Sequence, residues 1–91
     1  MSDKFTALKN KYLSSFPAKL EGIKNAYEQQ DIKQVHDLIH KLAGSSGGYG
    51  FDEISLHCKS ILLQLHESDN KTTKDIEKAI EHLLTLLSSA K

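Results

Sequence analysis

The sequence is poor in the features that mark disulfide-bonded, membrane-spanning or polyanion-binding proteins. It has one cysteine, Cys58, so no disulfide can form within the chain. No apolar run approaches the roughly 20 residues that a transmembrane helix requires, and residues 1–4 are not the start of a signal peptide. The 12 basic and 12 acidic residues cancel, which leaves no net positive charge to attract nucleic acid or an anionic membrane. We therefore expect a cytoplasmic protein that binds neither nucleic acid nor membrane.

Aromatic residues and overall hydrophobicity are also limited. Aromatic side chains make up 7% of the 91 residues and hydrophobic ones 38%. Because a chain this short leaves much of its surface exposed, we expect a single domain over residues 1–91 with one modest core. Leucine and isoleucine dominate the periodic apolar positions, so this core should form by packing of aliphatic helix faces.

Apolar residues recur at steps of three and four, the spacing of one helix face, and no stretch alternates as a strand would. The first such pattern comprises Phe5, Leu8, Tyr12 and Phe16. Pro17 fits the first turn of a helix after a capping Ser14 or Ser15, and it indicates a new helix or a kink. The apolar pattern then continues, so residues 4–30 form either two helices or one bent helix.

Polar residues that can cap helices indicate three more. Asp31 precedes one helix, Asp52 a second, and Thr72 or Thr73 a third, while Phe51 could staple the entry to the second. Short connections make consecutive helices antiparallel neighbours. The sequence therefore predicts an all-α fold, an antiparallel up-down-up-down four-helix bundle with room for a short extra helix at its N-terminus.

His40 stands out because helical phase turns it away from the core. At 100° per residue, one side of its helix carries the positions Val35, Leu38, Ile39, Leu42 and Ser46. The other side carries His40 with Lys33, His36, Asp37, Ala43, Gly44 and Gly47. Two glycines inside a helix would cost about 2 kcal/mol relative to alanine. Something should therefore require a bare backbone beside this histidine.

Spacing alone leaves a second interpretation of this segment open. Gly44 can be the residue that ends the helix, with residues 45–50 as a flexible loop. An exposed histidine is also common and usually has no function. The pattern by itself does not decide between a helix end and a functional surface.

A metal site is one functional alternative. His36 and His40 have the i, i+4 spacing of two zinc-binding histidines, but Asp37 is the only further ligand on that face. Cys58 falls on a core stripe and is expected to be a small buried residue. No role can be assigned to the other histidines, His57, His66 and His82. The pattern does not complete a metal site.

The sequence also gives little support for a nucleophilic enzyme or a nucleotide-binding loop. A surface nucleophile is the remaining chemical role for His40. No Ser/His/Asp or Cys/His/Asp arrangement is evident, and residues 44–48 lack the Gly-Lys-Ser/Thr of a phosphate-binding loop. Neutral imidazole is a good nucleophile at cellular pH because its pKa is about 6.5. Phosphoryl transfer to it requires exposure and benefits from nearby cations. His40 is exposed by phase, and Lys41 and Lys33 are the cations within reach.

A longer motif resembles the histidine-containing phosphotransfer (HPt) domains of multistep phosphorelays. It runs His40-Lys41-Leu42-Ala43-Gly44-Ser45-Ser46-Gly47 and continues with Gly50, Phe51 and a helix that begins near Ile54. The resemblance covers essentially the whole chain, because length and helix order also agree. In that family the helix continues past the glycine, so the resemblance favours a continuous helix over a C-cap at Gly44.

The resemblance implies a specific function. His40 would accept a phosphoryl group on Nε2 from the aspartyl phosphate of a hybrid sensor kinase's receiver domain, and pass it to the receiver domain of a response regulator. The receivers would supply Mg²⁺ and most of the catalysis, so this chain would be a monomeric phosphocarrier with no ATP site, metal or cofactor, and not an enzyme. Lys41 would be the charge partner of the phosphate, and Gly44 would leave room for it. The proposed docking residues are Lys33, His36, Asp37, Ala43 and Gly47.

Two positions depart from the pattern of that family. Many members have lysine three residues after the histidine, where this chain has Ala43, and often Gln or Glu 22 residues after it, where this chain has Leu62. The second change removes a side chain that can orient the imidazole.

Two alternative functions stay open. The first is a helical interaction module that carries no phosphate, and the second is a metal-binding bundle that uses His36 and His40.

Overall fold

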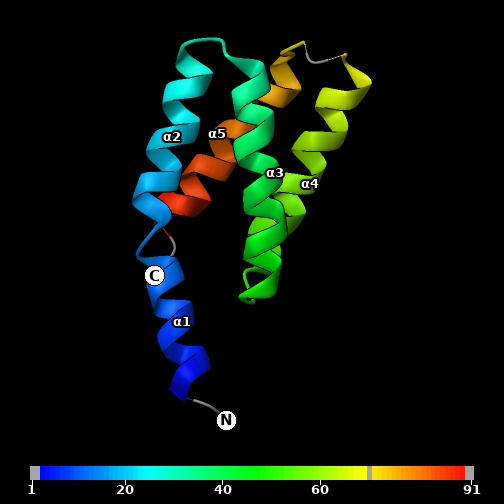
Figure 1. Cartoon of the computed structure of the whole chain (residues 1–91). Helices are drawn as coiled ribbons and strands as arrows, with labels where there is room; N and C mark the ends of the chain where they lie inside the picture. Colours follow the sequence, from blue (N-terminus) through cyan, green and yellow to red (C-terminus); the bar gives the residue numbers. More distant parts are fainter. Residues whose placement is uncertain (1–2, 70, 90–91) are drawn as a thin grey trace.

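The computed structural model describes residues 3–69 and 71–89. These residues form five helices. These are α1 (Asp3–Leu13), α2 (Phe16–Glu28), α3 (Ile32–Gly48), α4 (Asp52–Glu67) and α5 (Lys74–Ser89). Helices α2 to α5 form a bundle in which α2 packs on α3 and α5, and α4 packs on the same two helices (Figure 1). The predicted four-helix bundle is confirmed, and so is the extra N-terminal helix.

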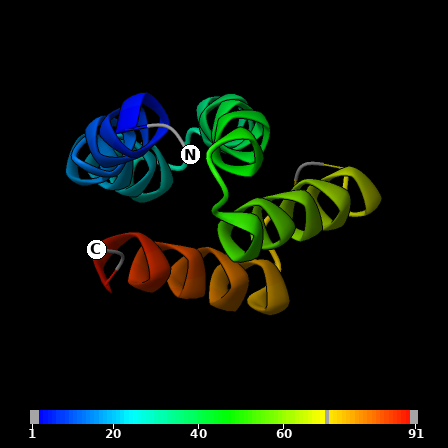
Figure 2. The same cartoon turned by 90° about the horizontal axis from the view of Figure 1, so that it is seen from below.

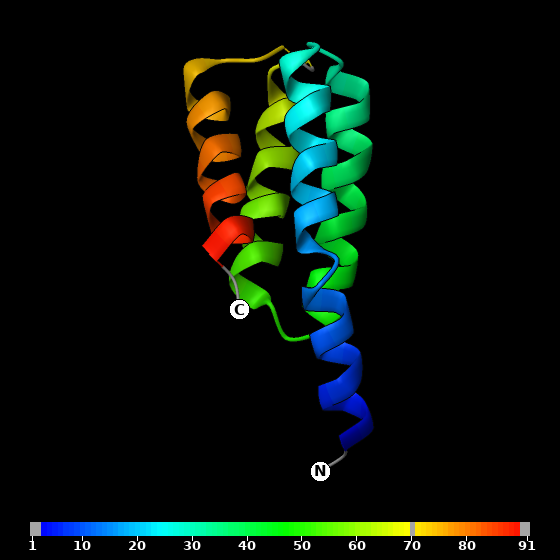
Figure 3. The same ribbon diagram turned by 90° about the vertical axis from the view of Figure 1, so that its left-hand side faces the viewer.

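Helix α1 projects beyond one end of the bundle and gives the molecule its elongated shape. It continues roughly in the direction of α2 (Figure 3), and the extents are 43 × 21 × 19 Å. The helix is interrupted at Ser14 and Ser15, so residues 4–30 form two helices. Phe5 and Leu8 on α1 remain 49% and 51% exposed. The apolar stripe of α1 is therefore about half exposed at Phe5 and Leu8, whereas Tyr12 packs against the core.

The core lies between α2, α3, α4 and α5, which surround it when the bundle is seen from below (Figure 2). Aliphatic side chains dominate it, as expected. The largest fully buried hydrophobic side chains are Phe16, Ile23, Val35, Ile39, Cys58, Ile61, Leu65, Ile76, Ile80 and Leu83. In residues 3–69 and 71–89, no helix combines the length and the hydropathy that a bilayer span needs.

The predicted caps are partly confirmed. The backbone N–H of Gln34 donates to Asp31 Oδ1 over 3.2 Å, and that of Ile76 donates to Thr73 Oγ1 over 3.2 Å. Asp52 is not a cap, because α4 begins at this residue and Phe51 holds the cap position without a side-chain bond. As an acidic residue in the first turn, Asp52 still lies where the helix dipole favours negative charge.

An aromatic cluster fastens the end of α1 to the loop between α3 and α4. The rings of Tyr12 and Tyr49 stack with centroids 4.4 Å apart and an interplanar angle of 14°. Phe16 contacts Tyr12 and Phe51 edge-on at 5.4 Å and 5.1 Å. The expected staple residue Phe51 therefore packs on the junction of α1 and α2. This cluster fixes the end of α3 against the rest of the bundle.

Candidate functional site

Helix α3 is continuous through the glycine-rich segment. It runs from Ile32 to Gly48, so the interpretation of Gly44 as a helix end is wrong. The helix is ended by Tyr49 and Gly50, whose φ of 85° lies in the left-handed region that favours glycine. The backbone N–H of Phe51 then donates to the Ser46 carbonyl over 2.9 Å. Gly44 and Gly47 therefore both lie inside a helix.

His40 lies exposed on α3, two turns before the end of that helix. Of the neighbours predicted on its face, Lys33, Asp37, Gly44 and Gly47 are exposed and His36 is half-buried. The His36 and His40 rings are nearly parallel, at 15°, with centroids 6.2 Å apart. His36 Nδ1 lies 3.6 Å from Asp37 Oδ1, both side chains being about half exposed. The structure thus brings five of the six predicted neighbours to the surface around His40.

Ala43 is the exception, and its predicted place on the solvent face is wrong. It is only 6% exposed, and its carbonyl accepts a hydrogen bond from the Ser55 hydroxyl of α4 over 2.9 Å. Because α3 packs against both α2 and α4, its solvent face is narrower than half of the helix circumference. Ala43 falls within the flank that α4 covers, so it does not contribute to an exposed docking surface.

The glycines of α3 have different surroundings. A Cβ added at Gly44 would meet no atom within 4 Å among the described residues, and the same is true at Gly48. A Cβ added at Gly47 would lie 3.3 Å from Ser55 Oγ. Gly47 therefore permits close approach of α3 and α4, whereas packing within the described chain gives no reason for glycine at Gly44. Its bare surface is available to a second molecule.

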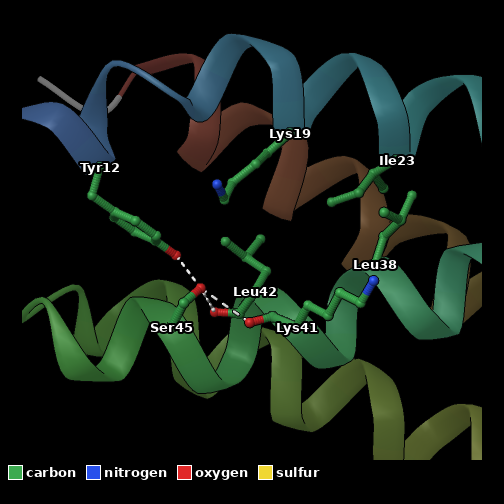
Figure 4. Close-up of a pocket in the computed structure, with 7 residues that line it drawn as sticks. All are labelled: Tyr12, Lys19, Ile23, Leu38, Lys41, Leu42 and Ser45. Carbon is green, nitrogen blue, oxygen red and sulfur yellow. Dashed lines mark hydrogen bonds between the residues drawn. The ribbon is translucent and has the colours of Figure 1, made fainter.

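Lys41 lies beside His40 and borders a groove between α2 and α3. The groove has a volume of about 360 Å³ and is lined by Tyr12, Lys19, Ile23, Leu38, Lys41, Leu42 and Ser45 (Figure 4). Its floor is apolar, and none of the described residues that line it is acidic. Lys19 and Lys41 thus add positive charge to an apolar groove, and Lys41 is the residue that follows His40.

A hydrogen-bonded chain closes one end of this groove. The Tyr12 and Ser45 hydroxyls are 2.5 Å apart, and Ser45 Oγ donates to the Lys41 carbonyl over 3.0 Å. Lys19 Nζ donates to Ser15 Oγ over 2.8 Å and lies 4.8 Å from the centre of the Tyr12 ring. Burial raises the pKa of the Tyr12 hydroxyl, and the Ser45 hydrogen bond opposes that rise. The end of α1 is therefore linked directly to the turn of α3 that follows His40.

Sequence reasoning missed Tyr12, Lys19 and Ser45 as neighbours of the site. Tyr12 and Lys19 come from α1 and α2, and periodicity within one helix does not indicate which side chains of another helix lie opposite. The one available signal was the position of Ser45 five residues after His40, on the flank that turns toward α2. Leu62 occupies the position where the family often has Gln or Glu, and it is half-buried against the core.

Outside the His40 region, the described residues form no three-ligand metal site and contain no reactive thiol. Within residues 3–69 and 71–89, no group of three or more His, Cys, Asp or Glu side chains is placed to hold a metal ion. Cys58 is fully buried, and burial raises the pKa of its thiol to about 12. A thiol with such a pKa is protonated at neutral pH and is a poor nucleophile. The arrangement around His40 is therefore the strongest candidate for chemistry.

Comparison with models of protein families gives a match. The family model described as Hpt domain matches residues 7–90, which is nearly the whole chain. Comparison with curated proteins and with solved structures gave no significant match. The matched range contains all of α2 to α5 and the end of α1 that carries Tyr12.

Proposed function

The chain belongs to the HPt domain family, which carries out histidine phosphotransfer in phosphorelays, and from this premise we propose that His40 is the phosphorylated residue. One observation carries the assignment. His40 is an exposed histidine one helical turn before Gly44, where an added Cβ would meet no atom of the described chain within 4 Å. A receiver domain can approach such a histidine without meeting side chains on that side.

The chemistry requires an unprotonated ring nitrogen on His40. We assign this role to Nε2, with Nδ1 carrying the hydrogen. The Nε2 lone pair attacks the phosphorus of an aspartyl phosphate, the bond from phosphorus to the carboxylate oxygen breaks, and the aspartate leaves as a carboxylate. The reverse reaction delivers the phosphoryl group to the aspartate of a second receiver. Because the receivers bind Mg²⁺, this chain contributes the nucleophile and its surroundings.

Lys41 is the proposed charge partner of the phosphoryl group. It follows His40 directly and has an exposed side chain, whereas Lys33 lies two turns earlier on α3. Phosphorylation adds nearly two negative charges at neutral pH, and a cation close to the phosphate stabilises them. Lys33 is farther along the helix axis, where solvent and salt screen it more strongly.

The docking surface proposed for the receivers extends from His40 over the groove between α2 and α3. Lys33, His36, Asp37 and Gly47 surround the histidine along α3. The groove adds an apolar floor and the positive charges of Lys19 and Lys41. Such a surface fits a partner that presents an apolar side chain with carboxylates around it, because both parts are then complemented. One partner is the receiver of a hybrid sensor kinase, and the other is that of a response regulator.

Transfer from a phosphorylated receiver tests the assignment. The receiver is labelled with ³²P and mixed with wild-type protein, His40→Gln or His66→Gln, the last of which replaces another exposed histidine. We expect an acid-labile, base-stable label on wild type and on His66→Gln, and none on His40→Gln. Label that persists on His40→Gln would contradict the assignment. A wild-type protein that binds receivers but takes no label would instead indicate an interaction module.

A further inference from the structure

Two histidines that the phosphotransfer site does not use come together across the opposite side of the bundle. His57 lies on α4 and His82 on α5, and their ring centroids are 4.6 Å apart with an interplanar angle of 52°. These two helices pack directly on each other (Figures 2 and 3). His82 is exposed and His57 half-buried, so an ion in solution can reach the pair.

The distance between the two ring centroids is compatible with a shared metal ion. With a metal–nitrogen bond of about 2.1 Å, two imidazoles in cis positions at 90° have centroids about 4.6 Å apart, and at the tetrahedral angle about 5.3 Å. The observed 4.6 Å matches the 90° arrangement. Tetragonal sites of nitrogen and oxygen ligands are typical of Cu²⁺ and Ni²⁺. We propose that His57 and His82 form a two-histidine site for a divalent ion of this class, with water in the remaining positions.

The other pair of neighbouring histidines fits such an ion less well. The His36 and His40 rings are 6.2 Å apart, farther than either arrangement allows without rotation of the side chains. Both also lie on α3, so an ion between them would join no two helices. An ion held by His57 and His82 would join α4 to α5.

The surroundings of the His57–His82 pair carry charge of both signs. Glu53 lies one turn before His57 on α4, and Glu81 and Lys78 precede His82 on α5. None of them completes a three-residue cluster in the part of the chain that the structure describes. The two imidazoles are thus the protein ligands of the site, and the chelate between two helices is the source of its affinity.

A link between α4 and α5 has a measurable consequence that does not depend on phosphotransfer. The two histidines are neighbours only in the folded state, since 24 residues of chain separate them, so an ion that binds both favours folding. The melting temperature should then rise with ion concentration. This effect is a property of α4 and α5, and it can hold or fail whatever the role of His40.

Ni²⁺ is the probe for the test, added to protein without a histidine tag. All variants carry His36→Ala, which removes the competing pair on α3. We expect Ni²⁺ to raise the melting temperature of this background protein and to bind with one-to-one stoichiometry by calorimetry. Adding His57→Ala or His82→Ala should abolish the rise and weaken binding on the order of a hundredfold, because one imidazole replaces a chelate.

His66→Ala in the same background is the matched control, since it removes another exposed histidine of α4 and should leave the Ni²⁺ effect unchanged. Far-UV circular dichroism checks that each variant folds, and His57→Gln and His82→Gln replace any alanine variant that does not. The proposal is overturned if Ni²⁺ does not raise the melting temperature of the background protein. It is equally overturned if the rise survives replacement of His57 or His82.

Discussion

Substitutions at Gly44 should separate the stability of the bundle from its function. Gly44 lies inside a 17-residue helix, and an added Cβ would meet no atom within 4 Å among the described residues. A glycine inside a helix costs about 0.5–1 kcal/mol relative to alanine. Gly44→Ala should therefore raise the free energy of unfolding by this amount. In a domain of this size, the gain corresponds to a rise of about 2–8 °C in Tm.

The glutamine variant adds the functional part of the prediction. Gly44→Gln should keep part of this stability gain, because glutamine is also a good helix former. Its side chain would occupy the space one turn after His40, into which the receiver is proposed to dock, so phosphotransfer should slow at least tenfold. Gly48→Gln is the matched control, because Gly48 is also helical, exposed and open but lies two turns from His40.

The measurements are thermal unfolding by circular dichroism and single-turnover transfer from a phosphorylated receiver. Clearance as the reason for glycine would be refuted if Gly44→Gln and Gly48→Gln transferred at the same rate. A melting temperature of Gly44→Ala equal to or below that of the wild type would refute the claim that this glycine costs stability. The two results are independent, so each half of the reasoning can fail alone.

Three further predictions concern packing, charge and burial. Gly47→Ala should not raise the melting temperature, because its Cβ would lie 3.3 Å from Ser55 Oγ. In a Ser55→Ala background, which removes that oxygen, Gly47→Ala should raise the melting temperature, as measured by thermal unfolding. Lys41→Ala should slow transfer more than Lys33→Ala in the same single-turnover assay, and equal effects would contradict the choice of cation. Cys58 should resist iodoacetamide at pH 8 in the folded protein and react in urea, because burial keeps the pKa of its thiol at about 12; rapid labelling of the folded state would show that the thiol is accessible.

Helical periodicity predicted most of the fold because the core is aliphatic and each helix buries one stripe. The stripe predicted on α3 agrees with the observed burial, since Val35, Ile39, Leu42 and Ser46 are buried and Leu38 is partly buried. Phe5 and Leu8 did not follow the rule, since α1 extends past the bundle and nothing in a periodic pattern tells where a neighbouring helix ends. Asp52 was misplaced by one residue, which is the usual uncertainty of a helix boundary.

The surroundings of the proposed site were predictable where they depend on one helix and unpredictable where they depend on two. The exposure of His40 and Gly44 follows from helical phase on α3, and the structure shows both exposed, as is Lys41. Ala43 was placed wrongly because phase on one helix does not show how far α4 covers its flank. Packing between helices also explains why Gly47 lacks a side chain, since a Cβ there would lie close to Ser55 of α4. It likewise brings His57 of α4 next to His82 of α5.

The aromatic cluster at the end of α3 gives the protein an intrinsic circular dichroism signal in the near ultraviolet. The chain has no tryptophan and three tyrosines, of which Tyr12 and Tyr49 stack in this cluster, while Tyr27 lies in the last turn of α2. Rigid, closely stacked rings dominate near-ultraviolet circular dichroism, whereas the far-ultraviolet signal reports helices throughout the bundle. The two spectral regions therefore follow different events, and loss of the near-ultraviolet signal alone would report loosening of the tertiary packing around this cluster while the helices persist.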